Sequence, residues 1–438
     1  MSTAREAALT VLERCRRDGA WSGQVLDRLL QSGSLDAKDA ALAVQLSLGV
    51  IQNSRFLDYY IDLYCHSSKL EPKLRDLLRL GAYQILLLDK IPSHAAVDES
   101  VSLCRAAGLS RASGLANAVL RRLSEHKKDL PEIPGKGSAS YLSIRYSQSA
   151  WLAEELIRQH GYDFTEAFFL ACQQPSGIDL QINTLKADLK TYTDFLQQNG
   201  KAFDCPPFPI NCVHLRGGNP GDLPGYEDGL FYVQDRAAAM AIELAGVRPG
   251  LKVLDACAAP GGKSFASAIR MENRGEIVSC DLHEKKLRLI ESGAKRLGIG
   301  CIKTMAADAS QLRSEWQNAF DLVIADVPCS GFGVMRKKPE IRMRSCEDVA
   351  RLPEIQARIL DNLSNYVMPG GTLLYSTCTV LRQENEAVVE GFLRTHRSFR
   401  PAEFTVGDKA SSNGCYTFWP HVDGTDGFFV SKLIRGTE

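Results

Sequence analysis

Two cysteines of this 438-residue chain stand where a thiol could react. Cys329 closely follows the apolar run FDLVIADV, and Cys378 closely follows GTLLYST. Short apolar runs of this kind predict buried strands, and the carboxyl ends of neighbouring parallel strands meet at one edge of a sheet. A lone cysteine is usually plain packing. Two cysteines at strand ends with polar neighbours favour a reactive pair that faces one cleft.

A pair of thiols suits methylation of cytosine at C5. That carbon is a poor nucleophile, but addition of a thiolate at C6 creates an enamine that can attack a methyl sulfonium. Asp326, just before Cys329, could hold N3 of the base protonated and so stabilise the adduct. A second group must then remove the C5 proton so that the first thiol can leave.

A glycine turn follows an earlier predicted strand, in the segment DACAAPGGKS from Asp255 to Ser264. Paired glycines let the backbone approach a ligand, and the helix start that follows offers N–H groups to an anion. A Walker A loop would need glycine where Cys257 stands, and the dinucleotide pattern G-x-G-x-x-G is absent. Asp281 and Asp308 close the next two predicted strands, and an acid there can accept ribose hydroxyls or simply cap a helix. The glycine turn and the acids at the following strand ends together indicate a nucleoside ligand.

A local excess of positive charge follows Cys329. Residues 334–344 carry five basic side chains against one acidic one. Such a segment suits phosphate contacts, although a solvated loop is the simpler alternative. We predict that Arg336, Lys337 and Lys338 bind RNA.

The elements that position these residues fall into three regions. Helical periodicity predicts an all-α bundle over residues 1–130, and prolines and glycines mark a linker at 131–140. Residues 141–235 mix helical and strand-like runs, which predicts a small α+β domain. Strands and helices alternate over 236–438, which predicts an open, doubly wound α/β sheet of parallel strands with helical crossovers.

Composition narrows the class of protein. Lysine plus arginine equals aspartate plus glutamate at 52 each, so the chain is not a globally basic RNA-coating protein. No apolar run approaches a membrane span, and the amphipathic start is unlike a secretory signal. Thirteen cysteines without a C-x-x-C pair indicate reduced thiols and no zinc site. We therefore expect a cytoplasmic protein without membrane or metal. No coiled-coil heptad or long unpaired apolar helix stands out, so we expect a monomer.

Several of these segments together resemble the NOL1/NOP2/Sun family of RNA cytosine-C5 methyltransferases. CAAPGGKS resembles the family's S-adenosylmethionine loop, DVPCSG its Pro-Cys motif and STCT its Thr-Cys motif. The resemblance implies that Cys378 is the nucleophile and that Cys329 assists release of the product. It implies cofactor contacts at Cys257, Ala258, Ala259, Pro260, Gly261, Gly262, Lys263, Asp281, Asp308 and Asp326.

Motifs that precede the glycine turn in the sequence make the resemblance more specific. IPSHAAVDESV and ANAVLRRL resemble the NusB-type RNA-binding domain, and QINTLK and YVQDRAA resemble the small domain that precedes the family's catalytic domain. This order of domains implies 16S ribosomal RNA as the partner, naked or in an early small-subunit assembly intermediate, with cytosine 967 as the target. Gln181, where an arginine is common, and Arg236, where an acidic or neutral residue is common, depart from the pattern at substrate-contact positions. Val327 and Phe332 replace a common alanine and threonine.

Other functions are weighed against this one. The same chemistry could act on transfer RNA or on another ribosomal cytosine, which the fused NusB-like domain argues against. A non-catalytic RNA-binding assembly factor would have no need of Cys329 and Cys378. A nucleotide-hydrolysing or dinucleotide enzyme would need the loops that are missing here.

Neutralising Arg336, Lys337 and Lys338 together is expected to weaken RNA binding and to flatten its salt dependence. Each lost phosphate contact removes a share of the counterion release that drives binding. RNA affinity measured over a salt series checks this prediction. An unchanged slope would identify the segment as an ordinary surface loop.

Overall fold

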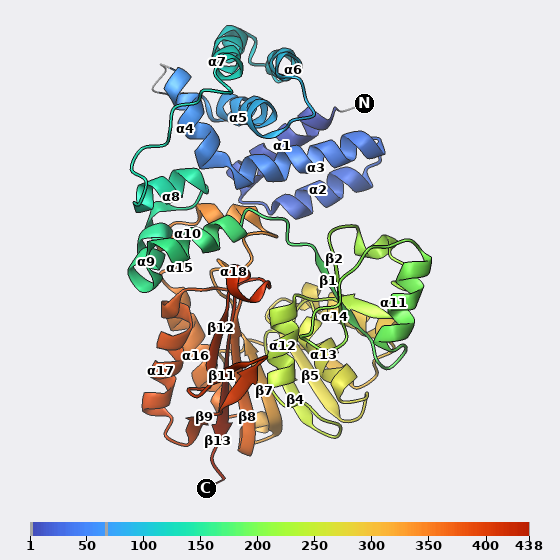
Figure 1. Cartoon of the computed structure of the whole chain (residues 1–438). Coiled ribbons are helices and arrows are strands. Elements are labelled where there is room, and N and C mark those ends of the chain that lie inside the picture. Colours follow the sequence, from blue (N-terminus) through green and yellow to red (C-terminus); the bar gives the residue numbers. More distant parts are fainter. Residues whose placement is uncertain (1–2, 66–68, 438) are drawn as a thin grey trace. The chain divides into compact units, whose positions relative to one another are not determined.

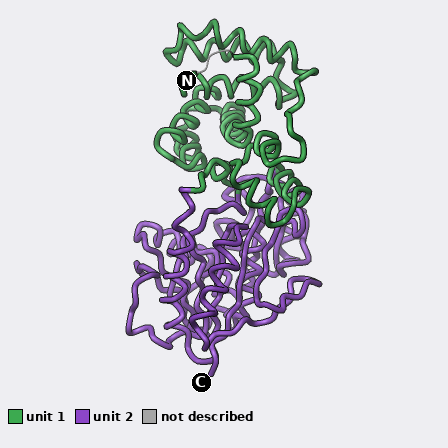
Figure 2. The backbone as a smooth tube through the Cα atoms, turned by 90° about the vertical axis from the view of Figure 1, so that its left-hand side faces the viewer, with its two compact units in different colours: residues 1–174, 335–346 green, residues 175–334, 347–438 purple. Residues whose placement is uncertain are grey.

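The computed structural model describes residues 3–65 and 69–437, which form two compact units (Figures 1 and 2). Unit 1 comprises residues 1–174 and 335–346, and unit 2 comprises residues 175–334 and 347–438. Among the described residues, no helix is both long and apolar enough to cross a membrane.

Unit 1 is helical. Its core contains the fully buried Leu77, Leu78 and Leu120. The first helix begins with a capping box, in which Thr3 Oγ1 accepts from the N–H of Glu6 while the Glu6 carboxylate accepts from the N–H of Thr3. The helices are α1 (Ala4–Asp18), α2 (Ser22–Gln31), α3 (Ala37–Gln52), α4 (Ser54–Tyr64), α5 (Pro72–Leu87), α6 (Ser93–Ala106), α7 (Ser113–Glu125), α8 (Ala139–Arg145), α9 (Ala150–His160) and α10 (Tyr162–Ala171), with 3₁₀ turns η1 (Ser110–Ala112) and η4 (Pro339–Met343).

Unit 2 contains two main sheets. A three-stranded antiparallel sheet, in the order β2 (Cys212–Leu215), β1 (Ile178–Ile182), β3 (Phe231–Val233), is accompanied by helix α11 (Leu189–Gln198) and the turn η2 (Pro220–Asp222). An eight-stranded sheet runs β12-β13-β8-β7-β4-β5-β6, with β9 paired to β13. Its strands are β4 (Lys252–Asp255), β5 (Glu276–Asp281), β6 (Ile302–Ala306), β7 (Phe320–Asp326), β8 (Val367–Thr377), β9 (Phe399–Pro401), β12 (Cys415–Phe418) and β13 (Phe428–Arg435).

Helices cover both faces of the large sheet (Figure 1). Alternate residues of one strand serve the two sides: Leu322 packs with α12 (Arg236–Leu244), α13 (Gly262–Arg270) and α14 (Glu284–Leu297), whereas Val323 packs with α16 (Leu352–Ser364) and α17 (Glu386–Thr395). The remaining short elements are η3 (Ser314–Trp316), α15 (Cys346–Val349), η5 (Arg382–Glu384), β10 (Phe404–Val406), β11 (Lys409–Ser411) and α18 (Pro420–Asp423).

The predicted fold class is confirmed. Strands β6, β5, β4, β7 and β8 pair in parallel. The sequence did not predict the antiparallel extension at one edge, where β13 pairs with β8, β9 and β12. Because β4 lies between β5 and β7, the order of strands reverses at β4, and sheets of this kind bind ligands at the carboxyl ends of strands beside such a point.

The structure divides the chain differently from the expected boundaries. Helices α8, α9 and α10, expected within the small α+β domain at 141–235, belong to unit 1. The segment 335–346, expected within the α/β domain, belongs to unit 1 as well.

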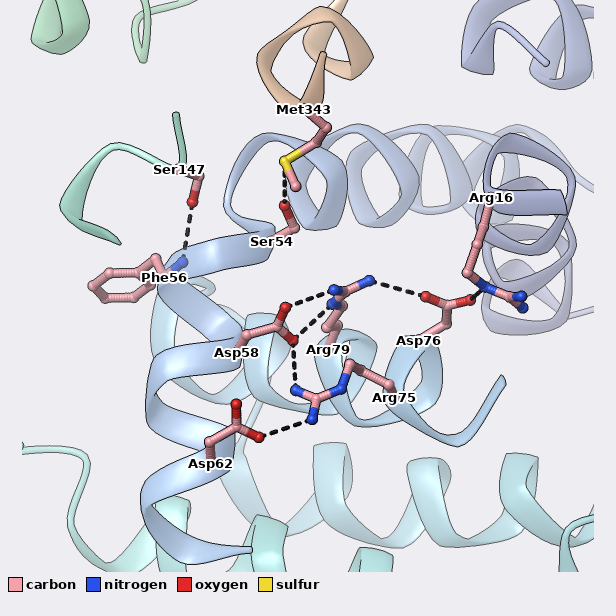
Figure 3. A network of polar contacts seen from close by, with 10 residues as sticks. All are labelled: Arg16, Ser54, Phe56, Asp58, Asp62, Arg75, Asp76, Arg79, Ser147 and Met343. Carbon is pink, nitrogen blue, oxygen red and sulfur yellow. Dashed lines mark hydrogen bonds and ion pairs between the residues drawn. The ribbon is translucent and has the colours of Figure 1, made fainter. Parts of the chain in front are cut away.

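An ionic network joins three helices of unit 1 (Figure 3). Arg79 on α5 donates to Asp58 on α4 at 2.6 Å and to Asp76 at 3.1 Å. Arg16 on α1 donates to the other oxygen of Asp76 at 2.8 Å, and Asp76 is only 2% exposed. Arg75 donates to Asp58 at 3.1 Å. Two guanidinium groups therefore balance the negative charge of the buried Asp76 carboxylate.

Arg79→Met is expected to lower the free energy of unfolding by about 2–3 kcal/mol, because it leaves the buried Asp76 with one partner fewer. Urea denaturation checks the value. Arg158→Met, which breaks the exposed pair with Glu155, is the control and should change stability little. Equal effects of the two substitutions would contradict this account of the network.

Candidate active site

The two thiols lie in contact at the ends of neighbouring strands. Asp326 of β7 and Ser376 of β8 are paired in register, so the residues that follow each strand emerge side by side. The Sγ atoms of Cys329 and Cys378 are 3.2 Å apart, and the N–H of Cys378 donates to Cys329 Sγ at 3.3 Å. A disulfide would need about 2.05 Å. The pair consists of free thiols that share a hydrogen bond.

The two thiols are not equivalent. The hydrogen bond with Cys378 raises the pKa of Cys329 well above the usual thiol value, and burial and the negative charge of Cys378 raise it further. At neutral pH Cys329 therefore keeps its proton. When the pair loses one proton, Cys329 is the donor and the negative charge lies on Cys378, and a thiolate is the nucleophilic form of cysteine.

Backbone contacts fix the Cys378 turn. The N–H of Gly333 donates to the Cys378 carbonyl at 2.9 Å, and the Gly333 carbonyl accepts from Gly427 at 2.9 Å. A Cβ at Gly333 would lie 1.8 Å from the Gly427 carbonyl oxygen, so no side chain fits there. Thr377 Oγ1 donates to Asn385 at 2.6 Å. Sequence reasoning missed Gly333, because a single glycine in a loop has no distinctive pattern.

A buried carboxylate fixes the Cys329 turn. Glu384 Oε2 accepts from the N–H of Ser330 and from Gln356, both at 2.9 Å. Gln356 also donates to the Pro328 carbonyl at 3.0 Å. Glu384 is fully buried, and its negative charge adds to the rise in the pKa of Cys329. No sequence motif pointed to Glu384 or Gln356.

Asp326 connects the thiols to the glycine turn. Its Oδ2 accepts from Lys263 Nζ at 2.6 Å, and its Oδ1 accepts from Ser376 at 2.8 Å. Burial lowers the pKa of Lys263, but the charge and hydrogen bond of Asp326 outweigh burial and raise it overall. Lys263 is thus a fixed positive charge. Its Nζ lies 5.2 Å from the ring centre of Phe428.

The glycine turn forms a tight cradle between β4 and α13. Gly261 has φ of +115° and its Cβ would lie 2.5 Å from Phe265. Asp255, at the end of β4, is fully buried: its Oδ2 accepts from Ser264, and its Oδ1 is without a hydrogen-bond partner among the described residues. Burial raises the pKa of Asp255 to about 7. Burial also raises the pKa of Cys257, so this thiol stays neutral.

Acidic side chains stand at four neighbouring strand ends. Asp281 ends β5, is 8% exposed and accepts from the N–H of His283 at 2.9 Å. The N-cap position of α14 is His283, so Asp281 is not the cap itself. Asp308 lies two residues beyond β6, is exposed, and accepts from the hydroxyl and N–H of Ser310, which lower its pKa.

The cradle and the acids fit S-adenosylmethionine. The N–H groups of the first turn of α13 have no partner within the helix and can receive a carboxylate. Asp281 presents an oxygen at the strand end where a ribose is held in such sheets. The unpartnered Asp255 oxygen is a further acceptor beside the turn. Among the described residues, no three histidine, cysteine or acidic side chains gather as metal ligands.

The three basic residues predicted to bind RNA belong to unit 1. Arg336, Lys337 and Lys338 lie in the segment 335–346, and Lys338 Nζ lies 5.2 Å from the ring centre of Trp21. The cysteine pair belongs to the other unit. Their contact with RNA stays a prediction.

Comparisons with known proteins agree with this geometry. Residues 243–434 match the family described as 16S rRNA methyltransferase RsmB/F, and residues 2–125 match the NusB family. The chain is 32% identical over 444 residues to a probable ribosomal RNA small subunit methyltransferase B of Bacillus subtilis, covering 99% of both chains. It is 30% identical to ribosomal RNA small subunit methyltransferase B of Escherichia coli O157:H7, covering 98% of each. The crystal structure of PH0851 superposes with a TM-score of 0.83 at 24% identity, covering 99% of both chains.

Fold, site and relatives define an S-adenosylmethionine-dependent methyltransferase of RNA. Within that class, the chain belongs to the ribosomal RNA small subunit methyltransferase B family, with a NusB-type helical domain ahead of the methyltransferase domain. The predicted family, cofactor and helical domain are confirmed.

Cys378→Ala is expected to shift the alkylation of Cys329 to lower pH. The substitution removes the hydrogen bond and the charge that raise the pKa of Cys329, so its thiolate forms earlier as pH rises. Iodoacetamide labelling, followed by peptide mass spectrometry over neutral to alkaline pH, measures the shift. An unchanged profile would show that the two thiols do not interact.

Proposed function

We propose that this protein methylates C5 of cytosine 967 in 16S ribosomal RNA, with Cys378 as the nucleophile and Cys329 assisting release. The observation that carries the proposal is the 3.2 Å contact between two free thiols, of which Cys329 holds its proton. When the two thiols share one proton, the sulfur of Cys378 is the nucleophile and Cys329 stays protonated until a later step. A protein that only binds RNA would have no need of two thiols in contact.

In the first step the Cys378 thiolate forms a bond to C6 of the base. The electron pair of the C5–C6 double bond moves toward N3, which gains a proton by way of the Asp326 carboxylate. Cys329 supplies that proton, because the thioether formed by Cys378 carries no charge and no longer raises the pKa of Cys329. Cys329 becomes the thiolate as Cys378 becomes neutral.

Bound S-adenosylmethionine supplies the methyl group as an electrophile. The Cys329 thiolate then removes the C5 proton, the C5–C6 double bond forms again, and the bond between Cys378 Sγ and C6 breaks. Cys378 leaves as a thiolate beside a protonated Cys329, and N3 returns its proton through Asp326 to solvent. The pair ends in the state in which it began.

The two matched families support the choice of substrate. The curated relatives named here are ribosomal RNA small subunit methyltransferases B, matched over nearly their whole length. The NusB-type domain favours ribosomal RNA over transfer RNA. We expect the enzyme to act as a cytoplasmic monomer on naked RNA or on an early assembly intermediate.

Methyl transfer to protein-free 16S ribosomal RNA tests the substrate. Labelled S-adenosylmethionine measures the transfer, and bisulfite sequencing maps the product. One protected cytosine, at position 967, is the expected result. Transfer only to transfer RNA, or to a different ribosomal cytosine, would overturn the proposed target, and no transfer to any RNA would favour a binding factor.

Cys329→Ala is expected to accumulate a covalent protein–RNA adduct, since the C5 proton stays in place after methyl transfer and Cys378 cannot leave. Denaturing gels detect the adduct as a slower band. Cys378→Ala is the matched control: it should form no adduct and no product, while its affinity for S-adenosylmethionine stays near that of the wild type. An adduct of equal yield in both variants would contradict the roles assigned here.

A further inference from the structure

The segment 335–346 is part of the helical unit although its neighbours in sequence belong to unit 2 (Figure 2). The chain passes from Val334 in unit 2 to Met335 in unit 1 and returns at Glu347. Met335 and Ile341 are buried. The contacts of the segment explain why it belongs to unit 1.

The strongest of these contacts comes from Arg342. Its side chain is fully buried, and its guanidinium donates to the carbonyl of Tyr146 at 3.1 Å and to that of Cys172. Its own carbonyl accepts from the N–H of Ser149 at 3.1 Å. Burial lowers the pKa of Arg342 to about 10, so it is still charged at neutral pH. A buried charge held by carbonyl groups is costly to displace.

Neighbouring residues add further contacts within unit 1. Trp151 Nε1 donates to the carbonyl of Arg344 at 2.9 Å, and Glu340 accepts from the N–H of Ser22 at 2.5 Å. Ser54, at the start of α4, donates to Met343 at 3.5 Å (Figure 3). The segment is therefore held from several helices and is not a free loop.

Both ends of the longer segment 328–356 lie at the cysteine pair. Its first residues include Cys329 and Gly333, whose N–H binds the Cys378 carbonyl. Its far end is Gln356, which donates to Pro328 and to Glu384. The segment 328–356, which includes α15 and the start of α16, thus has both ends at the cysteine pair and its middle in the helical unit.

We propose that Arg342 is a positioning residue: by anchoring the middle of the segment 328–356, it helps to hold the Cys329 turn in its reactive geometry. This inference rests on the proposed roles of Cys329 and Cys378. A purely structural role of Arg342 would affect the stability of unit 1 and leave the reactivity of Cys329 unchanged.

The test compares Arg342→Met with Arg79→Met in the full-length protein. Both remove a guanidinium from unit 1, but Arg79 contacts Asp58 and Asp76 and no residue of 335–346 in the contacts described. Loss of the two guanidinium hydrogen bonds of Arg342 is expected to raise the rate of Cys329 alkylation at least about tenfold, through local opening. Arg79→Met should leave that rate unchanged. With RNA and S-adenosylmethionine, Arg342→Met alone should accumulate the covalent adduct.

Trp151→Phe is the milder variant if Arg342→Met does not fold, because it removes the hydrogen bond to Arg344 and keeps an aromatic ring. It should shift Cys329 alkylation in the same direction by a smaller factor. Equal Cys329 reactivity in folded wild-type, Arg342→Met and Trp151→Phe proteins would overturn the inference. Altered reactivity in a protein that transfers no methyl group to RNA would instead overturn the proposed function and leave the coupling in place.

Discussion

The parallel pairing of β7 with β8 is the constraint on which the site depends. Register places Asp326 opposite Ser376, so both strands end at the same level and the chains that follow bring the two sulfur atoms within 3.2 Å. A slip of one residue would turn each side chain to the opposite face of the sheet. The buried alternation of Leu322 and Val323 against different helices opposes such a slip.

Charge is balanced locally around this pair. Lys263 neutralises Asp326, while Glu384 is held by the Ser330 N–H and by Gln356. The hydrogen bond with Cys378, burial and the negative charges of Cys378 and Glu384 raise the pKa of Cys329 and keep its proton in place. The same arrangement supports the proposed roles, in which Cys378 attacks the base and Cys329 assists release.

Much of the fold and of the site could be predicted from local sequence. Apolar runs that end in Asp326 and Thr377 predict the strands β7 and β8, and the glycine turn after β4 predicts a ligand site. Strands β9 and β12 could not be predicted, because three and four residues are too few to show a period, and no local pattern encodes the antiparallel pairing of β13 with β8. The burial of Arg342 was equally hidden, since a basic residue in a basic run predicts exposure, and the carbonyl groups that hold it come from Tyr146 and Cys172.

Trapping the adduct on the wild-type protein tests the central claim most directly. RNA carrying 5-fluorocytosine at the target position cannot lose its C5 substituent as a proton, so the covalent intermediate should persist. Peptide mass spectrometry then identifies the modified cysteine. The account predicts the nucleotide on Cys378, methylated at C5, with Cys329 free. A nucleotide on Cys329, or no covalent product with RNA that is otherwise methylated, would contradict it.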